Sequence, residues 1–282
     1  MAYTDLLVHL DNYPAPMPGP LLEEAVALAA SLDAKATGLA VEVDIPVHSN
    51  RLADYLIGLS ALGREEEARC RAACTSSLAH FTTAATAAGV FQDVVLTRSH
   101  YLDRGEPVTR QARTRDLCLL PRPAGIEQQF DVAEAVVFGC GRPVLMFRAG
   151  ALGDLKTWPG LAVVAWDGSR GAARAMADAL PLLKRAGRVR VLTVLNEKPG
   201  ARAVLGLDAV RHLAMHGVTA VRDEIDGGGK PIGETLDAYL VREEANLLVM
   251  GAYGHSRLQE FLLGGATDYA LRSATCPVLL SH

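Results

Sequence analysis

The residues best suited to chemistry form a glycine-rich segment near the end of the chain. It reads Gly251-Ala-Tyr-Gly254-His255 and, further on, Gly264-Gly265-Ala266-Thr267, so its glycines are spaced G-x2-G-x9-G-G. Glycines lack a Cβ and let backbone N–H groups approach an anion, while a helix N-terminus offers free N–H groups and a positive dipole end. Because a helical pattern follows Gly264 directly, the segment predicts a cradle for the phosphates of a nucleotide.

The elements around this segment alternate between strands and helices. Strands that alternate with helices indicate right-handed βαβ crossovers and a parallel sheet covered on both faces. Such sheets bind ligands at the carboxyl ends of strands, where the winding direction reverses. The glycine-rich segment follows the fourth strand of the second half, which should bring it to that edge. The strand-like runs of the second half lie at 161–166, 189–195, 218–225, 246–250 and 277–280.

The first half of the chain repeats this order. Its first strand ends at Asp11 where the other half has Asp167, and both last strands begin Pro-Val-Leu. The repeat therefore divides the chain into residues 1–149 and 150–282, joined by a short Gly- and Pro-containing stretch at 149–159. The strand-like runs of the first half lie at 5–10, 37–43, 94–97, 116–120 and 143–147.

The first half carries surplus residues at 46–89. They include the charged run Arg64-Glu-Glu-Glu-Ala-Arg-Cys-Arg71, flanked by alanine and leucine, which predicts a long amphipathic helix. A solvated helix that covers the core is the ordinary interpretation. A surface for a protein partner is the alternative.

Three motifs of the second half resemble the universal stress protein family. The glycine-rich segment is similar to its G-x2-G-x9-G-[S/T] nucleotide loop and follows Val249-Met250-Gly251, while Asp167-Gly168-Ser169 and Cys276-Pro277-Val278 match its first and last strands. The resemblance covers 160–282 by motif and 3–149 by architecture alone. It implies an α/β fold of two tandem, open-twisted, parallel five-stranded sheets with flanking helices, Rossmann-like and akin to the adenine nucleotide α-hydrolases. It also implies that the two last strands associate within one chain as a pseudo-dimer.

The resemblance further implies an adenine nucleotide site, for ATP with or without Mg²⁺, with AMP or ADP as alternatives. Asp167 would accept a hydrogen bond from the adenine edge, and backbone groups around Val194 would complete the base contact. Where the family has serine or threonine after its third glycine, this chain has Gly265, which removes a hydroxyl that could contact phosphate or a metal-bound water. The residues expected along ribose and phosphates are Gly251, Gly254, His255, Gly264, Gly265, Ala266 and Thr267.

The corresponding segment of the first half departs from this pattern. Its fourth strand leads into Pro121-Arg122-Pro123, where the prolines remove N–H donors, and only Gly125 lies nearby. We expect a lost nucleotide site there and a scaffold or regulatory role for residues 1–149.

Several other patterns suggest chemistry but fit simpler roles. Ser169 lacks the preceding glycine of a nucleophile elbow and suits a helix N-cap, and Lys230 precedes proline, unlike the lysine of a P-loop. His212 and His216 have metal-ligand spacing, but the sequence indicates no third ligand. Without an arginine finger or a catalytic carboxylate at a recognisable offset, we expect no catalysis beyond slow ATP hydrolysis.

Composition limits the classes of partner. The chain has 282 residues, half of them apolar, with a net charge of −4, which predicts a folded protein and argues against nucleic-acid binding. Its apolar runs are shorter than the roughly 20 residues that span a bilayer, and no signal peptide is visible, so we expect no membrane partner and a cytoplasmic location. Five cysteines, an odd number, suggest reduced thiols.

Two alternative hypotheses remain besides that of a nucleotide-binding module of the stress response. One is an interaction or scaffold protein of the same fold without nucleotide, and the other is an adenylate-handling enzyme. A further homodimer and unidentified protein partners are compatible with each hypothesis.

Overall fold

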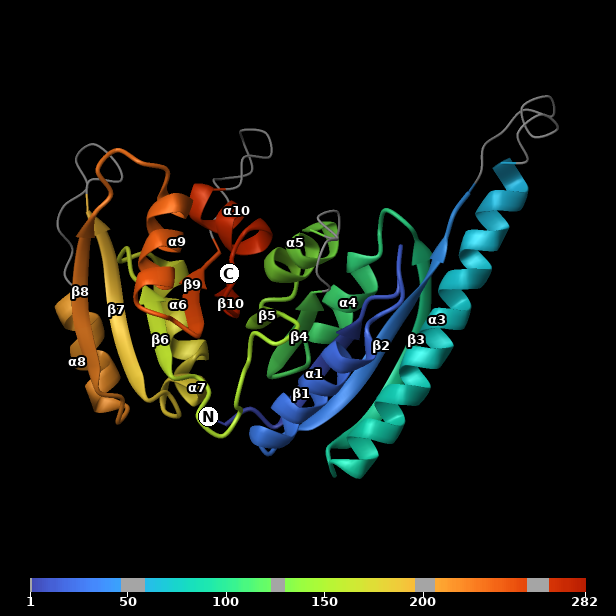
Figure 1. The fold of residues 1–282 in the computed structure, drawn as a ribbon, viewed down its shortest axis with the longest axis horizontal. Coiled ribbons are helices and arrows are strands. Elements are labelled where there is room, and N and C mark those ends of the chain that lie inside the picture. The colour runs from blue at the N-terminus through green and yellow to red at the C-terminus, as the bar shows by residue number, and fades with distance from the viewer. Residues whose placement is uncertain (1, 47–58, 123–129, 196–205, 253–263) are drawn as a thin grey trace.

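The computed structural model describes residues 2–46, 59–122, 130–195, 206–252 and 264–282, and within them strands alternate with helices twice over (Figure 1). The strands are β1 (Asp5–Leu10), β2 (Lys35–Asp44), β3 (Phe91–His100), β4 (Leu117–Arg122), β5 (Val144–Arg148), β6 (Leu161–Ala165), β7 (Arg188–Leu195), β8 (Ala220–Asp226), β9 (Leu247–Gly251) and β10 (Val278–Ser281). The helices are α1 (Gly19–Ser31), α3 (Leu59–Ala87), α4 (Gly105–Ala112), α5 (Phe130–Gly139), α6 (Arg170–Asp178), α7 (Leu180–Leu183), α8 (Gly206–Met215), α9 (Ile232–Arg242) and α10 (Gly265–Arg272).

These strands form one sheet in the order β3-β2-β1-β4-β5-β10-β9-β6-β7-β8. Neighbours within each half pair parallel, whereas β5 and β10 pair antiparallel, with Leu145 opposite Leu279. Figure 1 shows this pair in the middle of the molecule, with β2 and β3 at one end and β7 and β8 at the other. The two expected five-stranded sheets are therefore continuous. Winding reverses between β1 and β4 in the first half and between β6 and β9 in the second.

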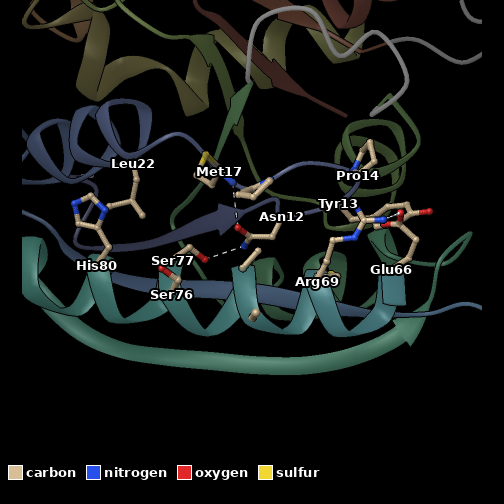
Figure 2. Close-up of a pocket in the computed structure, with 14 residues that line it drawn as sticks. Asn12, Tyr13, Pro14, Met17, Leu22, Glu66, Arg69, Ser76, Ser77 and His80 are labelled. Carbon is tan, nitrogen blue, oxygen red and sulfur yellow. Dashed lines mark hydrogen bonds and ion pairs between the residues drawn. The ribbon is translucent and has the colours of Figure 1, made fainter. Parts of the chain in front are cut away.

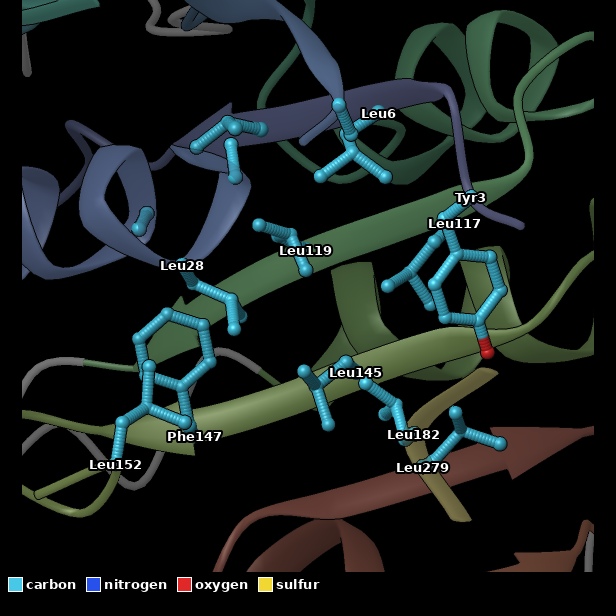
Figure 3. Packing of buried hydrophobic residues seen from close by; sticks show 14 of the residues in the cluster. Tyr3, Leu6, Leu28, Leu117, Leu119, Leu145, Phe147, Leu152, Leu182 and Leu279 are labelled. Atoms are coloured by element: carbon cyan, nitrogen blue, oxygen red, sulfur yellow. The ribbon is translucent and has the colours of Figure 1, made fainter. Parts of the chain in front are cut away.

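The apolar core lies on both faces of the sheet and crosses the junction. One buried cluster joins the sheet to α1, α3, α6, α7 and α8, and the other joins it to α4, α5, α9 and α10. In Figure 3, Leu145 and Leu279 lie beside Leu182 of α7, and each of the three is fully buried. Strands covered on both faces need apolar side chains in consecutive positions, which explains why the sequence runs are continuous rather than alternating.

The long helix expected in residues 46–89 is confirmed within the described part as α3, of 29 residues. It packs on β2, and Cys70, Cys74, Phe81 and Ala85 face inward and are buried. The solvated-helix interpretation accounts for this contact because the run around Arg69 stays on the outer face, where the Arg69 side chain is 64% exposed.

The predicted strands are confirmed with shifted ends. The largest extension is at β3, which runs over ten residues from Phe91 because it pairs with β2 along its whole length. Trp166 lies just beyond β6. All five cysteines carry free thiols. Of the helices in the described ranges, none is both long and apolar enough to cross a bilayer.

Candidate functional site

A cavity of about 350 Å³ opens at the carboxyl edge of the second half, where winding reverses between β6 and β9. Its walls come from the ends of β6, β7 and β9 and from the starts of α6, α9 and α10. Gly254 and His255 lie outside the described residues. The other predicted site residues all line this cavity: Asp167, Val194, Gly251, Gly264, Gly265, Ala266 and Thr267.

Asp167 supplies the carboxylate in the cavity wall. It follows β6 and is exposed, and its Oδ1 accepts a hydrogen bond of 2.8 Å from the backbone N–H of Ser169. This bond fixes the orientation of the carboxylate within the turn before α6. An oriented, solvent-facing carboxylate is able to accept a hydrogen bond from a ligand amine.

Ser169 is the N-cap of α6. Its Oγ accepts a hydrogen bond of 3.1 Å from the N–H of Ala172, which is the role the sequence predicted. The cap fixes the start of α6 beside the cavity, which both Ser169 and Ala172 line.

Gly251 is required by packing. A Cβ at this position would lie 2.3 Å from the carbonyl carbon of Gly171 and 2.6 Å from the nitrogen of Ala172. These are backbone atoms that cannot rotate away, so the end of β9 approaches the start of α6 only with glycine here. The glycine thus serves strand–helix packing whether or not a ligand is present.

Gly265 stands in a different environment. It is exposed at the first turn of α10, and a Cβ there would lie 3.1 Å from Cγ2 of Ile232, a side chain that can adjust. Gly264 is the N-cap of α10 and provides no side-chain cap. The first N–H groups of α10 therefore face the cavity without an acceptor from a capping side chain, as an anion site requires.

Apolar side chains that the sequence analysis missed complete the walls. They are ordinary core residues of a strand or helix, and only their position at the carboxyl edge distinguishes them. Such walls suit the flat face of a heterocyclic base. They include Trp166, Leu192, Ile232, Leu236 and Met250.

The matching position of the first half is filled by its own side chains. The cavity there is about 30 Å³ and is lined by His9, Asp11 and Phe130 among others. Asp11, the counterpart of Asp167, is buried and accepts a hydrogen bond of 3.3 Å from Nη1 of Arg104, whose Nη2 lies 3.1 Å from Asp131. Pro123 and Gly125 of the glycine-poor segment lie outside the described residues, and the loss of a nucleotide site in this half stays a prediction.

Burial perturbs the ionisable groups around this small cavity. Burial raises the pKa of Asp11 to about 6, and the nearby Arg104 charge opposes the shift. Burial also lowers the pKa of His9 to about 3, and here Arg104 acts in the same direction. A neutral imidazole is therefore held in the core at neutral pH.

The other chemical patterns stay outside the cavity. His212 and His216 are exposed, with ring centroids 4.7 Å apart, and no cluster of three or more candidate metal ligands from His, Cys, Asp and Glu occurs in the described ranges. Lys230 is exposed and is not part of the cavity wall.

Comparison with known proteins supports a family for the second half. The model of the universal stress protein family matches residues 162–282. A universal stress protein from Archaeoglobus fulgidus DSM 4304 is similar over 98% of this chain and 97% of its own, with a TM-score of 0.68 and 16% identity. A functionally unknown protein from Pseudomonas aeruginosa PAO1 covers 99% and 92%, with a TM-score of 0.54 and 17% identity. Both show a shared fold across the two halves. No curated protein matches the chain.

Proposed function

We propose that the chain is a universal stress protein, because the model of that family matches residues 162–282, and that its second half binds an adenine nucleotide, ATP above all. The observation that carries the proposal is the cavity of about 350 Å³ in whose wall the predicted site residues of the described part come together. It combines apolar walls, an oriented carboxylate and the start of a helix, which match a base, its amine and a phosphate chain.

At the base end, Leu192 and Val194 of β7 offer apolar contact, and Asp167 accepts a hydrogen bond from the exocyclic amine of adenine. A purine with a keto oxygen at the same position would bring an acceptor against the carboxylate. A bound base would shield the Asp167 carboxylate from water, and leaving it unpaired or repelled there would cost about 1–3 kcal/mol, so Asp167 favours adenine over hypoxanthine.

At the phosphate end, the backbone N–H groups of Gly265 and Ala266 at the start of α10 take the anionic oxygens. Gly265 brings no hydroxyl to a metal-bound water. We therefore expect ATP to bind with little dependence on Mg²⁺.

The nucleotide acts as a signal in this proposal, and the protein serves as a regulatory or protective module of the stress response. Among the described residues that line the cavity, Asp167 is the acidic or basic side chain, and the proposal gives it the role of a base contact. Residues 1–149 act as a scaffold or regulatory half in a pseudo-dimer with residues 150–282. A cytoplasmic location stays a prediction.

Titration calorimetry of the full chain with ATP and with inosine triphosphate tests the proposal. We expect one ATP site per chain and weaker binding of the inosine nucleotide. Asp167→Asn should lower ATP affinity by about tenfold and reduce the preference for ATP, since a hydrogen bond to a charged group is worth about 1.5–3 kcal/mol. Asp208→Asn, on an α8 side chain that is 77% exposed, is the matched control.

A second candidate is an interaction protein without nucleotide. The small cavity of about 30 Å³ at the corresponding edge of the first half supports it, because one half of this chain already has little room for a nucleotide there. Absence of binding heat for every nucleotide, in a sample shown to be folded, would reject the ATP proposal and support this one.

A further inference from the structure

Two thiols of α3 lie side by side in the first half. Cys70 and Cys74 are four residues apart, so they share one face of the helix, and their Sγ atoms are 3.9 Å apart. Both are buried, at 3% and 0% exposure. Both sulfurs approach the carbonyl oxygen of Val41 on β2, at 3.8 Å and 3.5 Å.

One of these thiols is reached from a cavity of about 470 Å³. This cavity lies between α3 and the segment that follows β1, from Asn12 to Met17 (Figure 2). Cys70 is part of its wall, and so is Met17, which carries a thioether. The cavity therefore gives a small solute access to the sulfur of Cys70, and the sulfur of Cys74 lies 3.9 Å behind it in the core.

The polar groups of this cavity are mostly occupied. The Asn12 amide donates to Ser77 Oγ and to the carbonyl of Leu10 at 2.8 Å each, and its Oδ1 accepts from the N–H of Met17 at 3.1 Å. His80 lies 2.9 Å from Glu23. Glu66 and Arg69, which also line the cavity, form an ion pair with each other, and Cys70 adds a thiol to the same wall.

The two thiols also differ in acidity. Hydrogen bonding from the Cys74 thiol lowers the pKa of Cys70 to about 7 against the opposing effect of burial, while the pKa of Cys74 is raised. Thiolates, rather than thiols, are the ligands of metal ions.

We propose that Cys70 and Cys74 form a binding site for a soft metal ion of low coordination number, Cu(I) in particular. Sulfur ligands select such ions. With metal–sulfur bonds of about 2.3 Å, two thiolates of a three-coordinate ion lie about 4.0 Å apart, close to the observed separation. Each thiol releases its proton to solvent as its sulfur–metal bond forms, so the neutral dithiol and a monovalent cation give a site of charge −1. Cys70 and Met17 line the same cavity, so a third ligand would come from that side.

Other uses of the pair fit the geometry less well. A disulfide needs Cβ atoms about 3.5–4.5 Å apart, whereas residues four apart on a helix hold them at about 5–6 Å. A tetrahedral zinc site needs four ligands, and no group of three or more His, Cys, Asp and Glu side chains gathers in the part of the chain described. A two-thiolate site suits an ion that accepts few ligands.

The test is competition for Cu(I) between the reduced full-length protein and a chromophoric Cu(I) chelator, without oxygen. We expect one Cu(I) per chain, together with a thiolate-to-copper charge-transfer absorption in the near ultraviolet. Cys70→Ser and Cys74→Ser should each weaken binding at least about 100-fold, because loss of a direct ligand exceeds the 10–100-fold effects of outer-shell changes.

The matched control is Cys276→Ser, which removes a partly exposed thiol of the second half and should bind Cu(I) as the unchanged protein does. Cys70→Ala is a second variant if serine disturbs the core, since alanine suits a helix interior. Thermal unfolding without metal checks that each variant is folded. No Cu(I) retained against the chelator, or equal losses in Cys276→Ser and Cys70→Ser, would overturn the assignment.

Discussion

The guanidinium of Arg122, at the end of β4 in the first half, donates a hydrogen bond to the carbonyl oxygen of Leu271 in the last turn of α10. A second donor of Arg122 lies 3.4 Å from the carbonyl of Arg272, and Arg148 reaches the same oxygen at 3.4 Å. Cations at a helix C-terminus complement its partial negative charge. One half of the protein thus caps the helix whose other end forms the proposed phosphate site of the second half.

Replacing Arg122 should loosen this contact. Burial lowers the pKa of Arg122 to about 10, with Arg148 acting in the same direction, so Arg122 remains charged at neutral pH. Arg122→Leu would leave the carbonyl of Leu271 without this donor, while Arg148 still reaches that of Arg272, and should lower the free energy of unfolding by about 2 kcal/mol. Urea denaturation measures this, with Arg113→Leu, which removes an exposed contact to Gly139, as control. An unchanged midpoint for Arg122→Leu would show that the cap contributes nothing.

Gly251→Ala should destabilise the fold without any nucleotide present. The new Cβ would overlap backbone atoms of Gly171 and Ala172, and overpacking of this kind costs about 3 kcal/mol. Gly265→Ala, where Ile232 can move, should cost less than about 1 kcal/mol. Chemical denaturation of both ligand-free variants compares them directly. Equal losses would mean that β9 and α6 are free to separate.

Gly265→Ser tests the departure from the family pattern on its own. If the proposed site holds ATP, a serine hydroxyl at the start of α10 should raise affinity about threefold to tenfold, the worth of one hydrogen bond. It should also make binding depend on Mg²⁺. Calorimetry with and without Mg²⁺ measures both effects, and Gly265→Ala controls for the added Cβ. Identical behaviour of the serine and alanine variants would argue against a phosphate at this position.

His9 predicts a pH dependence of stability. Its pKa in the folded protein is lowered to about 3, below that of a free imidazole, so its contribution is present above about pH 6.5 and is lost as pH falls. Between pH 6.5 and 5 the protein should lose about 2 kcal/mol relative to His9→Gln. Taking the difference between the two proteins cancels the pH dependence that comes from all other ionisable groups. Parallel stability curves over this range would mean that His9 is readily protonated in the fold.

Much of the fold could be predicted from the sequence, because continuous apolar runs such as β9 and the repeated Pro-Val-Leu of β5 and β10 reflect strands buried on both faces. The predicted ends of the strands were less accurate than their positions in the chain. β3 runs farther than its apolar residues because its pairing with β2 continues through polar positions such as Arg98 and Ser99.

The part of the candidate site that consists of glycine and aspartate, such as Asp167 and Gly264, could be predicted from the sequence. Its apolar walls could not, because Leu236 or Met250 has the same pattern as any core residue. The need for glycine at position 251 also depends on α6, which is distant in sequence. The same holds in the first half, where Arg104 reaches Asp11 from a separate element.

The proposed metal site at Cys70 and Cys74 could not be predicted from the sequence. Their spacing on one helix face is plain in the sequence, and packing is the usual role of such thiols. The distance between the two sulfurs is known only from the structure. The neighbouring cavity forms because the segment after β1 lies across α3.

The antiparallel pairing of β5 with β10 joins two copies of one plan inside a single polypeptide. In a dimer of identical chains every substitution occurs twice, so a change that suits one copy must be tolerated by the other. Here each half has its own codons. The first half has Arg104 bonded to Asp11 beside a small cavity and carries paired sulfurs at another, while the second half has a larger cavity at its carboxyl edge. A substitution in one half of this chain is therefore not repeated in the other, and the two halves can differ where a symmetric dimer could not.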